Sequence, residues 1–438
     1  MIRLCLYLIA WGLWCEPAQS QGATRLEERF APGQVFRVTS RSNLRGTIQV
    51  NKGEGKEPQQ VSLTGTSTLD YHERVLTLDQ AGLAQKTLRL YRQLDYQRQI
   101  GDQPQSHSLR SVTRRRVIWR TERGQIDSFS PDGALTWSEL DQARWELFTP
   151  LLAGLLPRQP VRVGERWAAA TPLVLALTDL ETLETGEIGC TLREIVGRAG
   201  RNVVVIAFSG TVAGVNADGS NRQRLEGTAH FDLQDQCVVH LTLSATSWML
   251  NPQGQEVGRI EGQFTLDRQR APVPELADAA LRGLVLDPMP GNTLILFDEP
   301  GVGASFTYPR SWTLRKADPK QIILDGPGGA GLLLTLEPLA KVPTIEQFKQ
   351  EASTTLARQA FKVLRQPTIR RVATQPFLID QFVVEVEAAN RTPLLFDYYV
   401  IRQTAGGATV AARYTPTQAA DSQRAVEVIV RSLRLDAR

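Results

Sequence analysis

The stretch VFRVTSRSNLRGTIQV, residues 35–50, alternates apolar and polar residues over most of its length. Phe36 and Val38 fall on one parity, and Arg37 and Thr39 fall on the other. Side chains of a strand point alternately to its two faces, so this pattern predicts a long strand with one buried face.

The same period of two recurs along the chain up to about residue 270. It is found in VSLTGTSTLDY, KTLRLYRQLDYQRQI, NVVVIAFSGTVAG, RLEGTAHFDLQ, CVVHLTLSATSWML and GRIEGQFTLDRQ. Turn sequences rich in Gly, Asn and Asp separate these stretches. One segment, TWSELDQARWELFTPLLAGLLP from Thr136, has helical spacing and ends at Pro157. We therefore expect a curved antiparallel sheet or half-barrel with one main helix over 136–156. The similar phrases that start at Leu63 and Leu225 indicate a possible internal duplication.

The last third of the chain mixes strands with two amphipathic helices. Thr344 and Gln347 form a capping-box pattern ahead of the first helix. In the second helix, DSQRAVEVIVRSL, Val426 and Ile429 fall on the face that should be buried. These patterns predict an antiparallel sheet flanked by helices. The overall fold class is therefore β-rich plus α+β.

The changes of pattern also suggest where the chain divides. We expect four segments: a signal peptide over 1–20, a β-rich domain over 24–269, a linker over 270–292 and an α+β domain over 293–438.

The beginning of the sequence predicts export. A basic start at Arg3 is followed by the apolar run Leu4–Trp14, and small residues stand at Ala18 and Ser20. This is the layout of a secretory signal peptide, with an apolar run too short for a permanent anchor. A buried helix or a lipoprotein signal at Cys15 are the alternatives. We expect a periplasmic or extracellular protein with no transmembrane anchor in the mature chain.

Charge gives no indication of nucleic-acid binding. The net charge of the 438 residues is only +4. The dense basic cluster, Arg110 to Arg123, alternates with Val117 and Trp119. We interpret it as the outer face of an exposed strand and not as a nucleic-acid surface.

The stretch LDGPGGAGLLLTL, residues 324–336, contains the spacing G-x-G-x-x-G that is typical of dinucleotide sites. Such a site needs a helix after the glycines, but Pro338 and Pro343 follow too soon. The glycines therefore predict a hairpin turn and no cofactor. Both faces of the flanking strands are apolar, so we expect both to be covered.

Residues that could carry chemistry are scattered. The four histidines (His72, His107, His230, His240) lack metal spacing, and His230 and His240 are predicted to lie on facing strands. Three acids (Asp179, Glu181, Glu184) are interpreted as a solvated linker face. The sequence thus predicts no catalytic, cofactor-binding or metal-binding residue. Four tryptophans, which could line a cavity or simply fill the core, are weak candidates for ligand binding: Trp119, Trp145, Trp167 and Trp248.

Two cysteines remain after the signal peptide, Cys190 and Cys237. We place them on the first and fourth strands of a four-strand meander, with Cys190 level with residues near Thr242. Three strand spacings separate them sideways by roughly 14 Å, whereas a disulfide needs Cα atoms within about 7 Å. The sequence predicts two free, buried thiols.

Two resemblances bear on function. LEGTAHFDLQDQCVVHLTLSA from Leu225 is similar to LolA-like exported half-barrel proteins, whose members carry lipoproteins or lipids. PVRVGERWAA from Pro160 resembles a phrase found in exported bacterial β-rich proteins of unassigned function. The element order over 293–436 and the phrase FTYPRSW from Phe306 resemble the PsbP-like (DcrB-like) fold family. That resemblance implies a helix-flanked antiparallel sheet and mostly assembly or binding roles.

These features favour an exported protein that acts by binding, its first domain holding an apolar ligand or a lipidated partner. The alternative is a structural or assembly factor that docks a protein partner through the PsbP-like domain. A hydrolase with a site assembled from distant residues is a third hypothesis.

Overall fold

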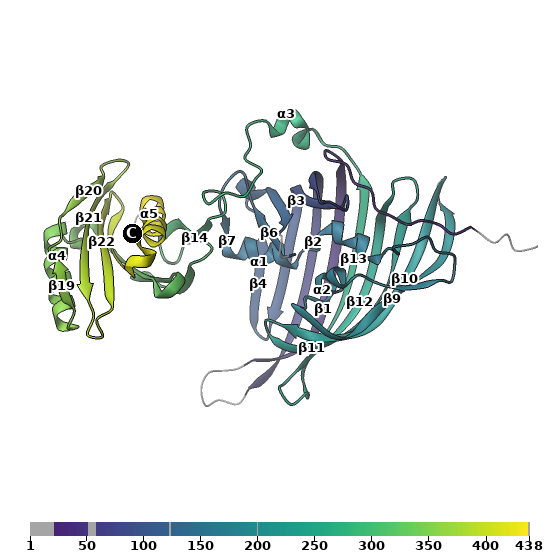
Figure 1. Cartoon of the computed structure of the whole chain (residues 1–438), viewed down its shortest axis with the longest axis horizontal. Coiled ribbons are helices and arrows are strands. Elements are labelled where there is room, and N and C mark those ends of the chain that lie inside the picture. Colours follow the sequence, from purple (N-terminus) through teal and green to yellow (C-terminus); the bar gives the residue numbers. More distant parts are fainter. Residues whose placement is uncertain (1–21, 51–57, 122–123, 199, 437–438) are drawn as a thin grey trace, which may run out of the picture. The chain divides into compact units, whose positions relative to one another are not determined.

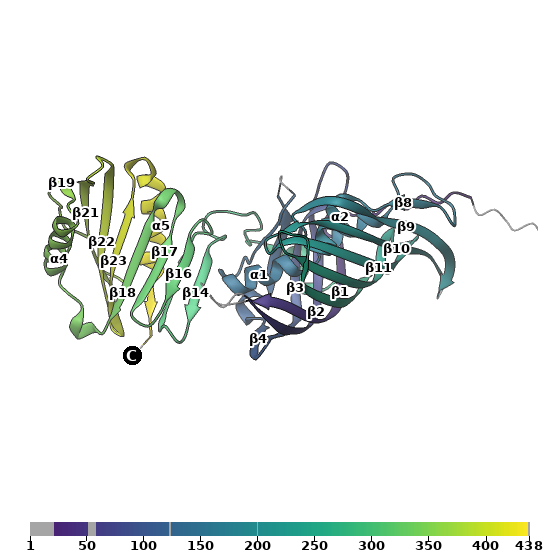
Figure 2. The ribbon, with the colours of Figure 1, turned by 90° about the horizontal axis from the view of Figure 1, so that it is seen from below.

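The computed structural model describes residues 22–50, 58–121, 124–198 and 200–436. The predicted signal peptide, 1–20, lies outside these residues. The described chain is rich in long antiparallel strands and has few helices (Figures 1 and 2), which confirms the β-rich plus α+β fold class. None of its helices is long and apolar enough to span a membrane.

The largest sheet has twelve strands. They are β1 (Val35–Val50), β2 (Gln59–Leu78), β3 (Ala84–Ile100), β4 (Gln103–Ser108), β5 (Arg115–Arg120), β6 (Ile126–Phe129), β8 (Arg166–Ala168), β9 (Thr182–Arg198), β10 (Arg201–Asn216), β11 (Gly219–Asp232), β12 (Cys237–Leu250) and β13 (Glu256–Arg270). Hydrogen bonds order them as β6-β5-β3-β2-β1-β13-β12-β11-β10-β9-β8, with β4 paired to β3. Strands β9 to β13 therefore form the meander expected from the sequence.

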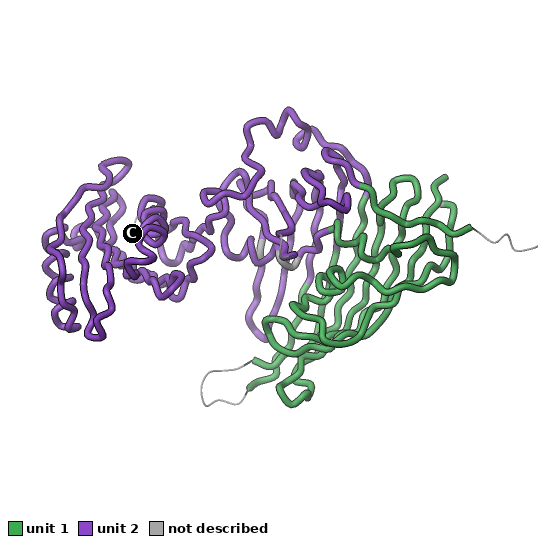
Figure 3. The backbone as a smooth tube through the Cα atoms, in the orientation of Figure 1, with its two compact units in different colours: residues 1–29, 41–65, 149–268 green, residues 30–40, 66–148, 269–438 purple. Residues whose placement is uncertain are grey.

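Contacts between residues divide the chain into two compact units (Figure 3). Unit 1 comprises residues 1–29, 41–65 and 149–268, and unit 2 comprises residues 30–40, 66–148 and 269–438.

In unit 1, glycines sit where neighbouring strands approach most closely. A Cβ atom on Gly210 would lie 2.0 Å from the carbonyl oxygen of Glu187. A Cβ atom on Gly227 would lie 2.1 Å from the carbonyl oxygen of Thr242. Glycine at such positions marks a tight bend, because any side chain would push the strands apart. The bends let the strands of unit 1 curve strongly.

One face of these strands is apolar and covered. Its residues Val204, Ile206 and Phe208 on β10 are at most 2 % exposed. A 3₁₀ helix, η2 (Thr149–Leu155), contacts β12 and packs on helix α2 (Thr171–Thr178), which contacts β9. The chain's own segments therefore cover this face.

The prediction of a single helix over 136–156 is wrong. The segment forms helix α1 (Trp137–Trp145) and then η2, with extended backbone at Glu146 between them. A capping box at Thr136 begins α1 as a regular helix. Pro150 has no backbone N–H to continue it, and the chain continues as η2.

An ion pair ties the first described residues to the far end of unit 1. The side chains of Glu28 and Arg268 are both fully buried and form an ion pair. The carboxylate of Glu28 also accepts a hydrogen bond from the backbone N–H of Val238 (2.8 Å), and Arg268 Nε donates to the carbonyl oxygen of Val238 (2.9 Å).

The two cysteines are buried and neither forms a disulfide, as predicted. Cys190 pairs with Phe208, Phe208 with Gly227, and Gly227 with Leu243. Cys190 therefore lies level with Leu243 on β12, one residue from the predicted Thr242. Burial raises the pKa of the Cys190 thiol to about 12, so the thiol stays protonated.

In unit 2, the basic cluster on β5 is not the exposed strand face that the sequence suggested. Arg116 is fully buried, and Thr113, in the short 3₁₀ helix η1 (Ser111–Thr113), is also buried. Arg110 and Arg116 both form ion pairs with Glu139 of α1. The alternating pattern suggested an exposed face, but the Glu139 carboxylate compensates the charges of Arg110 and Arg116 and so allows Arg116 to be buried.

Two further sheets involve the last third of the chain. The four-stranded sheet has the order β24-β15-β14-β7, from β7 (Leu135–Thr136), β14 (Ile295–Glu299), β15 (Ala304–Tyr308) and β24 (Arg434–Leu435). The eight-stranded sheet has the order β16-β17-β18-β23-β22-β21-β19, with β20 paired to β21. Its strands are β16 (Thr313–Ala317), β17 (Gln321–Asp325), β18 (Gly331–Glu337), β19 (Lys362–Arg365), β20 (Arg370–Ala373), β21 (Leu378–Glu387), β22 (Pro393–Gln403) and β23 (Gly406–Tyr414). The short helices η3 (Pro274–Leu276), α3 (Asp278–Leu281), η4 (Pro327–Gly329), η5 (Leu339–Lys341) and η6 (Pro416–Gln418) lie in connections.

The glycine motif forms the predicted hairpin. Strands β17 and β18 flank η4, and Gly331 begins a strand and not a helix. The expectation that both faces are covered is wrong, because Leu333 of β18 is 36 % exposed. Alternate residues such as Leu332 and Leu334 are buried, so only one face is sealed.

Helices α4 (Ile345–Arg358) and α5 (Ala419–Ser432) pack on opposite faces of this sheet (Figures 1 and 2). The capping box predicted at Thr344 and Gln347 begins α4. On the other face, Val426 and Ile429 of α5 are fully buried, as their spacing predicted.

Candidate functional site

Helix α4 covers only part of its face of the eight-stranded sheet. Its buried residues Ile345, Ala352 and Leu356 pack in a cluster with Phe382 and Val384 of β21 and with residues of β22. The helix contacts β19, β21 and β22. The same face of β17, β18 and β23 extends past the helix.

Beside the helix this leaves an open groove of about 510 Å³, within the usual size range of small-ligand sites. The sheet side is formed by Ile323, Leu324, Asp325, Gly331, Leu332, Leu333, Thr335, Phe396, Tyr398, Thr409, Ala411, Ala412 and Arg413. The other side is formed by Phe348, Glu351, Ala352, Thr355, Leu356, Gln359 and Phe361.

Aromatic rings build one wall of the groove. Phe348 of α4 meets Tyr398 edge-on at 5.6 Å between ring centroids. Phe361 meets Phe396 edge-on at 5.4 Å. Behind them Phe382 stacks on Tyr398 at 4.8 Å. Such offset and edge-to-face pairs fix the rings and add to the energy of their burial.

The floor of the groove is aliphatic and reaches solvent. Ile323 and Ala411 are half-buried, and Leu333 is 36 % exposed. Burial raises the pKa of Tyr398 to about 12, so its phenol is neutral at physiological pH. The inner surface of the groove therefore carries no charge from these side chains.

Charged groups stand only at the rim. Arg413 and Glu351 are exposed, and neither forms an ion pair with any residue in the described ranges. Asp325 is paired with Arg315 (2.7 Å). An apolar chain could lie on the floor while a polar head reaches Arg413 at the mouth.

The tryptophans proposed from the sequence do not gather at this groove. Trp119 on β5 is half-buried, and its ring meets Phe129 at 5.6 Å in the hydrophobic core of unit 2. Trp145 ends α1, but its side chain lies outside the described part of the structure. A ligand-binding role for either residue stays a prediction.

The other two tryptophans lie on opposite faces of the unit 1 strands. Trp167 pairs with Cys190 on the covered face, and its indole N–H donates to the carbonyl oxygen of Leu155 (2.8 Å). Trp248 lies on the other face, with the Arg222 guanidinium 5.0 Å from its ring centroid. The two rings cannot line one cavity.

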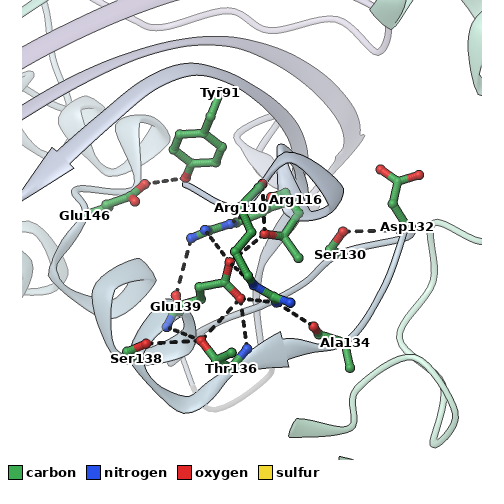
Figure 4. A network of polar contacts seen from close by, with 11 residues as sticks. Tyr91, Arg110, Arg116, Ser130, Asp132, Ala134, Thr136, Ser138, Glu139 and Glu146 are labelled. Atoms are coloured by element: carbon green, nitrogen blue, oxygen red, sulfur yellow. Dashed lines mark hydrogen bonds and ion pairs between the residues drawn. The ribbon is translucent and has the colours of Figure 1, made fainter. Parts of the chain in front are cut away.

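A buried network of charges in unit 2 was not foreseen from the sequence (Figure 4). The Glu139 carboxylate accepts hydrogen bonds from Arg110, from the Thr113 hydroxyl (2.5 Å) and from the backbone N–H of Thr136 (2.9 Å). Burial raises the pKa of Glu139, but these hydrogen bonds and the Arg116 charge outweigh it and hold the pKa below its usual value.

A second part of the network centres on Arg89, which is 1 % exposed. Its guanidinium pairs with Glu73 and Glu146, both at 2.8 Å, and lies 4.5 Å from the ring centroid of Tyr71. The Tyr91 hydroxyl donates to Glu146 (Figure 4). Arg89 is paired with both carboxylates, although Glu146 Oε1 has no hydrogen-bond partner among the described residues. We interpret the network as structural. It fixes the extended residues between α1 and η2.

Another buried carboxyl lies in unit 2 on the α5 side of the eight-stranded sheet. Asp397 is fully buried and accepts hydrogen bonds from Gln381 (2.6 Å), Tyr399 (2.8 Å) and Tyr414 (3.2 Å). Burial raises the pKa of Asp397, and the hydrogen bonds and the Arg370 charge only partly offset that effect.

Two of the histidines lie on facing strands, as predicted. His230 and His240 are paired across β11 and β12, with ring centroids 5.0 Å apart. Glu181 and Glu184 are exposed near the start of β9. In the described ranges no three His, Cys, Asp or Glu side chains are grouped so that they could hold a metal ion.

Comparison with known proteins gives weak likenesses. No family model and no curated protein matches the chain. The structure of cyanobacterial PsbP (CyanoP) from Synechocystis sp. PCC 6803 is 11 % identical, with a TM-score of 0.26, over 32 % of this chain and 92 % of that one. A lipovitellin structure, described for its lipid–protein interactions, is 11 % identical with a TM-score of 0.30 over 56 % of this chain. The match spans 26 % of lipovitellin's own length.

A PsbP structure is thus among the weak likenesses, and neither of these two structures is described as LolA-like. Scores this low carry no argument about function. They establish no specific role.

Proposed function

We propose that the protein is a binding protein that holds an apolar ligand in the groove beside α4. The observation that carries the proposal is the groove itself: about 510 Å³ of space with an aromatic wall and an aliphatic floor. Apolar surface left open to water at this scale is costly, and its covering by a ligand is favourable.

The sequence placed an apolar ligand in the first domain. The geometry of unit 1 favours that location less, because Leu152 and Leu155 of η2 and Leu173 of α2 are fully buried in the cover of its apolar face. A ligand there would have to displace them. The α4 groove needs no displacement.

The chemistry of the groove favours an amphipathic ligand. Its floor offers no charged partner, whereas Arg413 at the rim could pair with an acidic head group. A long-chain carboxylic acid has this combination. We also propose that the protein acts outside the cytoplasm, on the basis of the signal peptide predicted from its sequence; the N-terminal sequence of the mature protein would test this.

The test uses 1-anilinonaphthalene-8-sulfonate as a fluorescent probe and palmitate as its competitor. We expect the probe to bind the folded chain and palmitate to displace it. Leu333→Gln puts an amide on the groove floor and should weaken both by about tenfold. Leu364→Gln is the matched control, because Leu364 is similarly exposed (45 %) on β19 outside the groove.

The rival function is docking of a protein partner through this same region. It predicts that palmitate fails to displace the probe and that native mass spectrometry of the purified chain finds a bound protein and no lipid. Equal palmitate binding by the Leu333 and Leu364 variants would show that the apolar ligand binds elsewhere.

A further inference from the structure

The uncovered face of the unit 1 strands carries a second groove, of about 600 Å³. It spans β9, β10, β11, β12 and β13, and it lies on the opposite face from Val204, Ile206 and Phe208 of the apolar core. Phe208 nevertheless borders the groove, since Gly227 beside it has no side chain.

The groove floor consists of cross-strand rows of small polar residues. Register places Thr191, Ala207, Thr228, Thr242 and Thr265 in one row. The next row contains Gly189, Ser209, Glu226, Ser244 and Gln263. Neighbours within a row are about 4.8 Å apart, and the two rows are separated by roughly 6.8 Å.

This surface is suited to two-way hydrogen bonding. A hydroxyl donates one hydrogen bond and accepts two, so each threonine or serine can meet a donor or an acceptor. Thr228 and Thr242 are linked to each other at 2.8 Å, which uses only part of their capacity. Gln263 and Glu226 add planar groups at the edge of the same floor.

The charges on this face balance. The groove itself contains one cation, Arg193, and one anion, Glu226. Glu226 also lies 3.6 Å from Arg224, and further along the face Arg259 pairs with Glu261 (2.8 Å). A polyanion would need an excess of unpaired cations, so nucleic acid is a poor fit.

Other partners fit less well. The floor is too polar for a lipid chain, because a hydroxyl covered by hydrocarbon loses its hydrogen bonds to water. An added β-strand has no place at the groove, since β10 to β13 have hydrogen-bonded neighbours on both sides and β8 pairs with β9 at Gly189–Thr191. A chain of neutral hydroxylated units offers donors and acceptors at closely spaced intervals.

We propose that this groove binds a neutral oligosaccharide through the hydroxyl rows of β9 to β13. The site is separate from the α4 groove and does not depend on the apolar-ligand function. Palmitate displacement should therefore be unaffected by changes here.

The experiment measures binding of three hexasaccharides, built from glucose, galactose and N-acetylglucosamine, by isothermal titration calorimetry. We expect at least one to bind, and Thr228→Val with Thr242→Val to weaken it by about tenfold. Valine keeps the shape and the strand preference of threonine. Thr185→Val, on the same face of β9 outside the groove, should leave binding unchanged.

Gln263→Leu gives a second test if the double variant folds poorly, because Gln263 is exposed. Three outcomes would overturn the proposal. None of the hexasaccharides binds at millimolar concentration; the groove variants bind as well as wild type; or only sulfated saccharides bind and 0.5 M salt abolishes that binding.

Discussion

Two apolar sheet faces in this chain are covered to different extents. In unit 1 the apolar face of β9 to β12 is closed by η2 and α2, whose leucines Leu152 and Leu173 are fully buried. In unit 2 helix α4 covers its side of the eight-stranded sheet over β19, β21 and β22, and Leu333 of β18 remains 36 % exposed. The same alternating pattern thus yields a closed core in one place and an open groove in the other.

The prediction with the largest expected effect concerns η2, which covers the apolar face of unit 1, and tests whether this cover contributes to stability. Leu152→Ala should lower the free energy of unfolding by about 2–5 kcal/mol, because it leaves a cavity at a fully buried site. Leu333→Ala, the matched change in the open groove, should cost less than about 1 kcal/mol. Urea denaturation measures both. Similar losses for the two variants would contradict the comparison.

A second prediction concerns the curvature of the unit 1 strands. Gly210→Ala would place its Cβ 2.0 Å from the Glu187 carbonyl oxygen and should cost on the order of 1–3 kcal/mol. Gly331→Ala is the control in the flatter hairpin of unit 2. Its Cβ would meet only the Leu324 carbonyl oxygen, at 3.9 Å, so we expect a neutral or slightly stabilising change. The thermal unfolding midpoints of the two variants measure the difference. An unchanged midpoint for Gly210→Ala would show that residue 210 does not approach the Glu187 carbonyl oxygen so closely.

A third, smaller effect tests the closed α5 side of the eight-stranded sheet. The pKa of Asp397 is raised in the folded state, so its contribution to stability is full below the unfolded pKa of about 3.9 and is lost as pH rises through the folded pKa. Asp397→Asn should therefore gain stability relative to wild type as pH rises from about 4. The difference in urea midpoint between the two proteins across pH 3–8 isolates this group.

A substitution at Glu139 should change stability with pH in the opposite direction, so it serves as a control for the substitution at Asp397. Its pKa is lowered in the folded state, so its contribution is present above the unfolded pKa of about 4.3 and is lost as pH falls through the folded pKa. Glu139→Gln should be least stable relative to wild type above pH 5. If the two variants showed the same pH trend, the buried environments described above would be wrong.

Much of the local structure could be predicted from the sequence. The strand at 35–50, the hairpin at Gly331, the capping box at Thr344 and the lack of a disulfide between Cys190 and Cys237 all follow from patterns within one element or a run of consecutive strands. Their physical causes are side-chain alternation, turn chemistry and strand spacing, which are local.

The candidate sites could not be predicted in the same way. Leu333 and Leu334 look alike in sequence, but Leu334 packs in the sealed core on the α5 side of the sheet, whereas Leu333 lies on the α4 side and borders the groove. Arg116 looks like a surface residue until the fold brings Glu139 next to it. Each of these depends on residues that are distant in sequence.

The buried pair of Glu28 and Arg268 has a consequence for the time course of folding. The two residues are 240 positions apart, and both are fully buried only when the first described residues lie against β12 and β13. During synthesis unit 1 cannot complete this contact until residue 268 is available. Contacts of such long range slow folding, since loop closure must precede the energy they supply. The chain would therefore remain incompletely folded for longer than a helical protein of the same size.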